Sequence, residues 1–207
     1  MLKRSRKYVV ALLLVLAGFG LVPAYLHAYT IAGASEIPNV LLGDKIVVNN
    51  AAYILRAPYS NTKLFRTGSP KRGDFVYLHL PNYPRLKGFF KRIVGLPGET
   101  FELRDNRAWI DGRALPVKTL SPADFAWVPT AHPIGSTVEN EDGHCVTFTP
   151  GKSEHRDHPP TRLEPGQYFL LGDNRDDSYD SREFGPVPEE LFEGKVIAIL
   201  PAGERAR

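Results

Sequence analysis

The sequence predicts a mainly β protein, an antiparallel β-sheet domain that follows one N-terminal apolar segment. Short runs of β-branched and aromatic residues recur along the chain between turn residues, as in β-rich proteins. Glycine and proline, at 18 residues each, favour many turns and short strands over long helices. Helical periodicity is scarce, and only Pro188–Phe192 is expected to form a single helical turn.

The predicted strands are four to six residues long, apart from one of three. Two of them, Thr100–Leu103 and Ala108–Ile110, flank a hairpin turn at Arg104–Arg107, and a further turn is expected at Asp111-Gly112. The other predicted strands, in chain order, are Lys45–Val48, Phe75–Leu80, Phe89–Val94, Cys145–Thr149, Tyr168–Leu171 and Val196–Leu200.

Residues 114–166 differ from the rest of the chain, because they are rich in proline and poor in strand-like runs. We interpret this region as a Pro-rich insertion or extended loop. It contains Phe125 and Trp127, which are expected either to pack on the main domain or to contact lipid headgroups, as interfacial tryptophans do.

The N-terminus combines a basic segment with an apolar run. Residues 1–7 carry four positive charges and no acid, and residues 8–29 carry no Asp, Glu, Lys or Arg. About 20 apolar residues suffice for a helix to cross a bilayer. Positive charges before the run place the N-terminus inside. We therefore predict a cytoplasmic segment 1–7, a transmembrane anchor 8–29 and an extracytoplasmic domain 30–207.

A cleaved signal peptide is the alternative interpretation of the same segment. It explains the basic start and the apolar run equally well. Its cleavage site is poor, because Leu26 stands where a small residue would be wanted before Ala28. Both interpretations export the body of the protein, and they differ in whether the body stays tethered to the membrane.

Charge and cysteine content exclude two classes of function. Without the four positive charges of residues 1–7, the net charge of +3 falls to −1, so nothing in the body attracts a nucleic acid. Cys145 is the only cysteine, which rules out an intramolecular disulfide and a cysteine-based zinc site. We expect Cys145 to be a buried, inert thiol.

Four stretches are candidates for chemistry: residues 33–44, 72–76, 90–99 and 172–185. Ser35 lies among small residues in a turn bounded by glycine and proline, where its hydroxyl can be accessible. A serine is a poor nucleophile unless a base takes its proton. None of the six histidines lies in these stretches, so a Ser-His-Asp triad has no evident histidine.

A lysine can replace histidine as the base if it is neutral near pH 7, which burial favours. Lys91 suits this role because it lies inside the apolar strand FFKRIVG, with Phe89 and Ile93 on its own face. The alternative is an edge-strand lysine whose ammonium reaches solvent.

The fourth stretch, residues 172–185, holds five acids and two arginines. Such density suits a fixed network of hydrogen bonds and ion pairs. A solvated loop or a calcium site are the alternatives, although the glycine and closing glutamate of an EF-hand are missing at the required offsets.

The sequences KRIVGLPGE, from Lys91, and GDNRDDSYDSREFGPV, from Gly172, resemble those of bacterial type I signal peptidases, which are membrane-bound Ser-Lys proteases. The resemblance covers nearly the whole chain beyond the apolar run. The first stretch departs from the family pattern of serine, methionine, any residue, proline and threonine. Here Glu36 replaces the methionine and Asn39 the threonine.

The resemblance implies acyl transfer by a serine–lysine dyad without metal or cofactor. Ser35 matches the nucleophile and Lys91 the general base. The backbone N–H of Ser35 matches an oxyanion donor, and Gly33 occupies the position where some members add a serine hydroxyl to the oxyanion hole.

Three further residues match supporting positions. Ser178 matches the serine that orients the lysine, and Asp180 and Arg182 match an ion pair near the site. The implied partners are exported precursors with signal peptides, membrane lipid and, by proximity, the secretion translocon. The family selects small residues, often alanine, one and three positions before the cut.

Glu36 leaves the level of activity open, because a carboxylate beside Ser35 favours a charged Lys91. Either Glu36 points to solvent and another side chain packs at the site, or the chain is a weakened, specialised or inactive homologue that binds signal peptides. Because Ser35, Lys91 and Ser178 are all retained, we expect an active enzyme. A dedicated conjugation or pilin-maturation peptidase with the same dyad is another alternative. A self-cleaving repressor would need a DNA-binding N-terminal domain in place of the apolar run.

Overall fold

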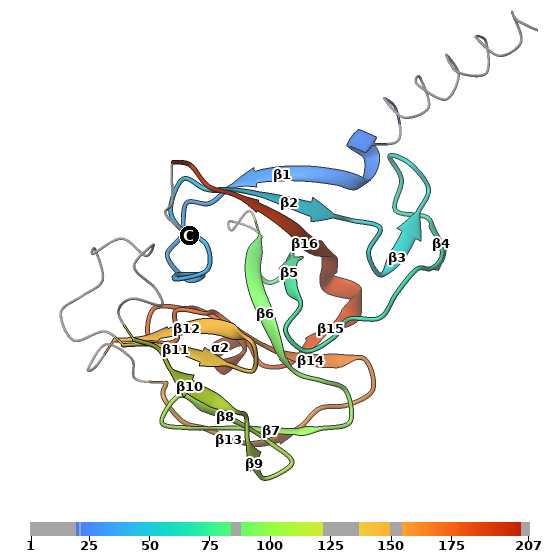
Figure 1. Cartoon of the computed structure of the whole chain (residues 1–207). Coiled ribbons are helices and arrows are strands. Elements are labelled where there is room, and N and C mark those ends of the chain that lie inside the picture. The colour runs from blue at the N-terminus through green and yellow to red at the C-terminus, as the bar shows by residue number, and fades with distance from the viewer. Residues whose placement is uncertain (1–19, 21, 84–87, 122–136, 150–154, 204–207) are drawn as a thin grey trace, which may run out of the picture.

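The computed structural model describes residues 20, 22–83, 88–121, 137–149 and 155–203, and within them it is built of antiparallel strands (Figure 1). The largest sheet has seven strands in the order β1-β2-β16-β5-β6-β14-β15. Its strands are β1 (Leu26–Thr30), β2 (Lys45–Asn49), β5 (Phe75–Leu78), β6 (Phe89–Gly95), β14 (Gln167–Leu171), β15 (Val187–Pro188) and β16 (Phe192–Leu200). The mainly β, antiparallel fold predicted from the sequence is confirmed.

Three smaller sheets complete the described part of the chain. A four-stranded sheet has the order β13-β7-β8-β9, a three-stranded sheet the order β10-β11-β12, and β3 pairs with β4. Their bounds are β3 (Ile54–Arg56), β4 (Lys63–Arg66), β7 (Thr100–Arg104), β8 (Arg107–Ile110), β9 (Arg113–Ala114), β10 (Val117–Thr119), β11 (Thr137–Glu141), β12 (His144–Phe148) and β13 (His158–Arg162). In Figure 1, β6 runs from the β1–β2 end of the molecule toward β7–β13.

Helical structure is limited to short pieces within the described residues. They are residues 22–25, α2 (Ser181–Phe184) and the 3₁₀ helix η2 (Glu189–Leu191). The expected turn of helix at Pro188–Phe192 is therefore confirmed. The hairpin between β7 and β8 is also confirmed, because Asp105 and Asn106 take positive φ values of 48° and 61°, as its tight turn requires.

The Pro-rich region 114–166 holds more strand than expected. The description of this region as a loop is wrong for β10, β11 and β13, because each pairs with a neighbouring strand. Pro159 and Pro160 lie in β13, an edge strand of its sheet, where a missing N–H costs least. Phe125 and Trp127 lie outside the described residues, so their two expected roles stay predictions.

The end of the apolar run is a strand. Residues 26–29, predicted as the last part of the anchor, belong to β1, which pairs with β2 from Leu26 opposite Asn49 to Thr30 opposite Lys45. Residues 8–19 and 21 of the predicted anchor lie outside the described residues. Among the described residues, no helix combines the length and the apolarity needed to span a bilayer.

The largest sheet has a buried core on each side. On one face Val76, Leu78, Ile93 and Leu170 pack together, and Phe89 lies against them. On the other, Val94 and Leu171 pack with residues of β7 and β8. Alternate residues of β6 therefore enter different cores, which is the expected outcome for a strand with side-chain period two.

Leu170→Ala tests this packing, because Leu170 is fully buried on β14, which pairs with β6. We expect the free energy of unfolding to fall by about 2–5 kcal/mol, from lost burial and a residual cavity. Urea unfolding of the full chain in detergent measures this change. Ile197→Ala on β16, where the side chain is 52% exposed, is the matched control and should change stability little. Equal losses in the two variants would contradict the assignment of this core.

Candidate active site

Ser35 lies in the loop that joins β1 to β2. Two backbone hydrogen bonds close this loop, from Ile31 N to Asp44 O at 2.8 Å and from Gly43 N to Ile31 O at 2.9 Å. Val40 is fully buried in the core beneath it. Ser35 therefore sits on a short, closed loop whose base is fixed by the sheet.

Lys91 lies near the middle of β6, paired opposite Val76 of β5. It is only 2% exposed. The interpretation of Lys91 as an edge lysine that reaches solvent is thus wrong, because β6 is flanked by β5 and β14. Phe89 and Ile93, which the sequence places on the same face of the strand as Lys91, do pack in the same hydrophobic core.

Ser35, Lys91 and Glu36 meet at one point. Lys91 Nζ lies 2.8 Å from Ser35 Oγ and 2.8 Å from Glu36 Oε1, and it also donates to the carbonyl of Phe90 at 2.9 Å. Ser35 Oγ in turn donates to Glu36 Oε1 at 2.8 Å. The structure therefore brings together the two residues predicted as a dyad and adds a third.

Glu36 does not point to solvent, and that alternative is wrong. The side chain is 2% exposed and forms a buried ion pair with Lys91. Burial raises its pKa to about 7, the charge of Lys91 opposes this rise, and Asp173 adds to it. Both the ionised and the protonated form of Glu36 are therefore accessible near neutral pH.

The fourth stretch holds the Ser35 loop in place. The backbone N–H of Asn174 donates to Ser35 O at 2.9 Å, and its side chain donates to Ala34 O at 3.1 Å. Asp173 forms a two-point ion pair with Arg92, at 2.7 Å to Nε and 2.6 Å to Nη2, and accepts from Asn39 Nδ2 at 2.7 Å. A single buried carboxylate thus links the fourth stretch to β6 and to the Ser35 loop.

Asp173 stays ionised in spite of its burial. Desolvation raises its pKa, but the charge and hydrogen bonds of Arg92 outweigh this effect and hold the pKa below its usual value. Arg92 also donates to Gly73 O at 2.8 Å, so the second candidate stretch, residues 72–76, joins the same network. Arg92 and Asn39 lie inside the third and first candidate stretches, but nothing in the sequence indicates that they share Asp173.

Ser178 lies close to the Ser35 loop without binding Lys91. A Cβ placed on Gly172 would meet Ser178 Oγ at 2.2 Å and Ser35 O at 2.7 Å, so these groups converge on Gly172. Within the described residues, Ser178 Oγ is buried without a hydrogen-bond partner. In the part of the chain that the structure describes, Lys91 Nζ contacts oxygen atoms of Ser35, Glu36 and Phe90. The lysine-orienting role of Ser178 stays a prediction.

Asp180 and Arg182 form the expected ion pair, with Nε to Oδ1 at 2.8 Å and Nη2 to Oδ2 at 2.9 Å. Asp180 also caps α2 in a capping box with Glu183 and accepts from Gly172 N at 2.9 Å. Burial raises the pKa of Asp180, but Arg182 and the Gly172 N–H lower it by more than burial raises it. The pKa therefore lies below its usual value, and the carboxylate is ionised. This pair fixes the backbone of the fourth stretch at Gly172.

Gly33 lies two residues before Ser35 and is exposed. A Cβ added there would meet nothing within 4 Å, so the position faces open space.

Cys145, expected to be buried, is only half-buried, and its carbonyl accepts from Asn39 at 2.6 Å.

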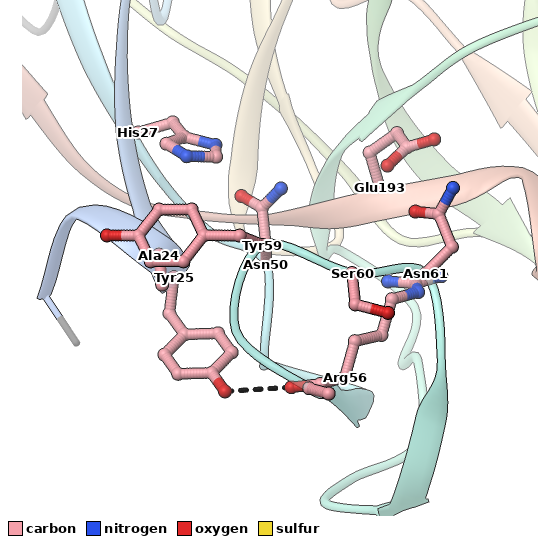
Figure 2. A pocket seen from close by; sticks show the side chains of 10 residues that line it. Ala24, Tyr25, His27, Asn50, Arg56, Tyr59, Ser60, Asn61 and Glu193 are labelled. Carbon is pink, nitrogen blue, oxygen red and sulfur yellow. Dashed lines mark hydrogen bonds between the residues drawn. The ribbon is translucent and has the colours of Figure 1, made fainter. Parts of the chain in front are cut away.

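A separate pocket lies where residues 22–25 meet the body of the protein (Figure 2). Tyr25 binds the body twice here, because its hydroxyl donates to Arg56 O at 2.7 Å and its carbonyl accepts from Asn50 N at 2.8 Å. Neither Ser35 nor Lys91 lines this pocket. It is a junction between the N-terminal segment and the sheet, apart from the candidate active site.

Comparison with known proteins shows which family the chain belongs to. The family model described as "Signal peptidase, peptidase S26" matches residues 3–200. The chain belongs to this family. Signal peptidases are serine endopeptidases that remove signal peptides from secreted precursors, so the family, the enzyme class and the activity predicted from the sequence are confirmed.

Curated signal peptidases match most of the chain. It is 30% identical to signal peptidase I of Pseudomonas aeruginosa over 92% of this chain and 68% of that protein, and 28% identical to signal peptidase I of Aquifex aeolicus over 96% and 85%. A crystal structure of a signal peptidase I from Enterococcus faecalis is 30% identical, covers 63% of this chain and 98% of that chain, and has a TM-score of 0.36, too low to bear on the fold.

Gly172→Ala tests the close approach of this signal peptidase's fourth stretch to the Ser35 loop. A methyl group at residue 172 would overlap both Ser178 and Ser35 O, so one of the two segments has to shift. We expect a loss of stability of about 1–3 kcal/mol and a fall in precursor cleavage. Unfolding in urea and a gel-based cleavage assay measure the two effects.

Gly203→Ala is the control for that experiment, because a Cβ there would meet nothing within 4 Å. It should leave stability and cleavage close to the wild-type values. If Gly172→Ala matched it in both measurements, the packing around Gly172 described above would be incorrect.

Proposed function

We propose that Ser35 is the nucleophile of this signal peptidase and that Lys91 is the general base that takes its proton. The 2.8 Å contact between Ser35 Oγ and the buried Lys91 Nζ carries this assignment. A hydroxyl beside a buried titratable group is the arrangement that an activated serine needs. The family's reaction supplies the substrate class, an exported precursor with a signal peptide.

In this reaction Ser35 Oγ attacks the carbonyl carbon of the scissile bond. The C–N bond then breaks, the leaving amine takes a proton, and water later hydrolyses the acyl-enzyme. The backbone N–H of Ser35, two residues after the exposed Gly33, is the proposed oxyanion donor. One such donor is worth about 3–4 kcal/mol of transition-state stabilisation in other proteases.

We propose that three residues, Asp180, Arg182 and Ser178, support the active site by fixing the position of the Ser35 loop. The Asp180–Arg182 pair is almost fully buried and holds Gly172 N, and Gly172 lies against Ser178 and the Ser35 carbonyl. These residues therefore act on the position of the Ser35 loop. We propose that the unpartnered hydroxyl of Ser178 contacts the Lys91 side chain once bound substrate excludes water from the site.

We further propose that residues 1–7 are cytoplasmic, that an anchor lies between residue 8 and the start of β1, and that the body is extracytoplasmic. The uncharged sequence after four positive charges supports this orientation. The hydrogen bonds of Tyr25 would hold the body at the membrane surface, next to lipid and to precursors that leave the translocon.

The nucleophile is tested with Ser35→Ala and Lys91→Ala on a precursor that has alanine one and three positions before the cut. Each variant should lose cleavage by on the order of 10³-fold or more, because catalytic groups that act as a unit fail together. The assay follows the mature product over time with the full chain in detergent. Ser60→Ala, an exposed serine on a distant loop, is the control and should cleave like wild type. Undiminished cleavage by Ser35→Ala would refute the assignment.

The orientation is tested by protease treatment of spheroplasts that express the chain. Since the body is proposed to lie outside, added protease should digest an epitope fused after Arg207 without detergent. A tag before Met1 should stay protected under the same conditions. Protection of the C-terminal epitope would overturn the proposed topology.

A further inference from the structure

Resting on the membrane location proposed above, we propose that the β3–β4 hairpin, together with the pocket of Figure 2, binds the headgroup of an anionic phospholipid of the phosphatidylglycerol type. The hairpin consists of β3, a loop of residues 57–62 and β4. Its contact with lipid would hold the body of the protein against the bilayer at a second point, besides the anchor.

The hairpin is joined to the segment that follows the proposed anchor. Tyr59, in the hairpin loop, donates to Gly20 O at 2.8 Å, and Tyr25 donates to Arg56 O at 2.7 Å. Gly20 belongs to the uncharged run of residues 8–29, and Figure 1 shows the hairpin beside residues 22–25. Signal peptidases of this family are anchored in the membrane. The hairpin is therefore placed where the chain leaves the bilayer.

The composition of the hairpin suits an anionic lipid surface. All four residues of β4, Lys63–Arg66, are exposed, and Leu64 and Phe65 are 53% and 59% exposed. Residues 45–73 contain six lysines and arginines and no acid, although the body as a whole is close to neutral. Exposed apolar side chains can enter the headgroup layer while basic side chains approach the lipid phosphates. The hairpin combines both kinds of side chain on one strand.

Tyr59 has the position and the exposure of an interfacial aromatic residue. It is 78% exposed, and its backbone φ of 56° is one that bulky residues rarely adopt. The loop around it is closed by hydrogen bonds from Ala57 N to Thr62 O at 2.9 Å and from Ser60 N to Ala57 O at 3.0 Å. Tyrosine is enriched at membrane interfaces, where an apolar ring and a polar hydroxyl are both satisfied. The loop thus holds an unfavourable backbone conformation at the residue that reaches Gly20.

The pocket beside the hairpin offers a cation for a phosphate group. Arg56 lines the pocket, and within the described residues its guanidinium has no hydrogen-bond or ion-pair partner. In Figure 2 its side chain extends toward Ser60 and Asn61, which add a hydroxyl and an amide to the same wall. A guanidinium can bind phosphate oxygens through two parallel hydrogen bonds. This wall of the pocket is therefore suited to a phosphodiester.

The same pocket also presents acceptors, which favour a headgroup with hydroxyl groups. Asn50 and Glu193 line it, and Asn50 Oδ1 is buried without a hydrogen-bond partner among the described residues. A buried acceptor is costly unless a donor reaches it. The hydroxyls of a glycerol headgroup are such donors, whereas a choline headgroup has none. Free phosphate shares the chemistry of Arg56 but makes no use of the exposed Leu64 and Phe65, so we assign the site to a lipid.

Photo-crosslinking of the full chain in lipid nanodiscs tests the proposal. The discs consist of phosphatidylcholine with a small, equal fraction of either photoactivatable phosphatidylglycerol or photoactivatable phosphatidylcholine. Mass spectrometry measures the share of adducts that fall on residues 54–66. We expect the phosphatidylglycerol probe to label the hairpin about fivefold more or better, since each basic side chain near an anionic surface contributes a factor of roughly five. The excess should fall at about 0.5 M salt, because salt screens exposed charges.

Two double variants show whether the preference belongs to the hairpin. Arg56→Gln with Lys63→Gln removes two of its charges and should abolish the preference. Arg113→Gln with Lys118→Gln makes the same change of charge on exposed residues of β9 and β10, at the opposite end of the molecule in Figure 1, and should keep it. Circular dichroism checks that both variants fold. If the two variants behave alike, or if wild type shows no preference, the proposal is wrong.

Competition separates a lipid site from a site for soluble phosphate. Unlabelled phosphatidylglycerol in the disc should displace the probe from the hairpin, whereas inorganic phosphate added at constant ionic strength should not. Displacement by inorganic phosphate alone would assign the pocket to a soluble anion and overturn the lipid assignment.

Precursor cleavage in the same discs distinguishes failure of this inference from failure of the proposed function. Both faces of a disc are open, so labelling does not depend on the orientation of the chain in a cell. If wild type cleaves precursor and Ser35→Ala does not, but the hairpin shows no lipid preference, the proposed function stands and the inference falls. If the hairpin prefers phosphatidylglycerol but no precursor is cut, the inference stands and the catalytic assignment falls.

Discussion

The buried carboxylate of Asp173 is the constraint on which the rest of the site depends. It joins Arg92 on β6, Asn39 on the Ser35 loop and, through its own backbone, Asn174, which holds the Ser35 carbonyl. These three segments are far apart in sequence. Because an unpaired charge is costly in a buried setting, removal of any partner would penalise the whole arrangement. The contact between Ser35 and Lys91 thus depends on these interactions of Asp173.

Half of the sixteen strands in the described part of the chain could be predicted, because each of these carries a local signal. The runs around Lys45, Phe75, Phe89 and Tyr168 alternate or stay apolar, and their ends fall within two residues of the prediction. Strands β10, β11 and β13 were not predicted, because they are short, polar or proline-bearing and form by pairing with neighbours. Residues 26–29 were assigned to the anchor because apolarity alone does not distinguish a strand from the end of a membrane helix.

The site was predictable residue by residue but not in its contacts. Motif resemblance selected Ser35, Lys91, Asp180 and Arg182, and the structure places the first two in contact and pairs the last two. Which way Glu36 points could not be read from the sequence, because that depends on the turn of the loop above β6. The departure from the family pattern at residue 36 was the signal in the sequence that this position affects the site.

The prolines of β13 have a consequence for a protein that meets unfolded chains. Pro159 and Pro160 lie on the outer strand of the four-stranded sheet and offer no backbone N–H. Because successive N–H groups along a strand point to opposite edges, an extended polypeptide that approached this edge would lack one of the donors needed to add itself as another strand. The same residues that obscured β13 in the sequence therefore disfavour the addition of an unfolded chain to this edge of the sheet.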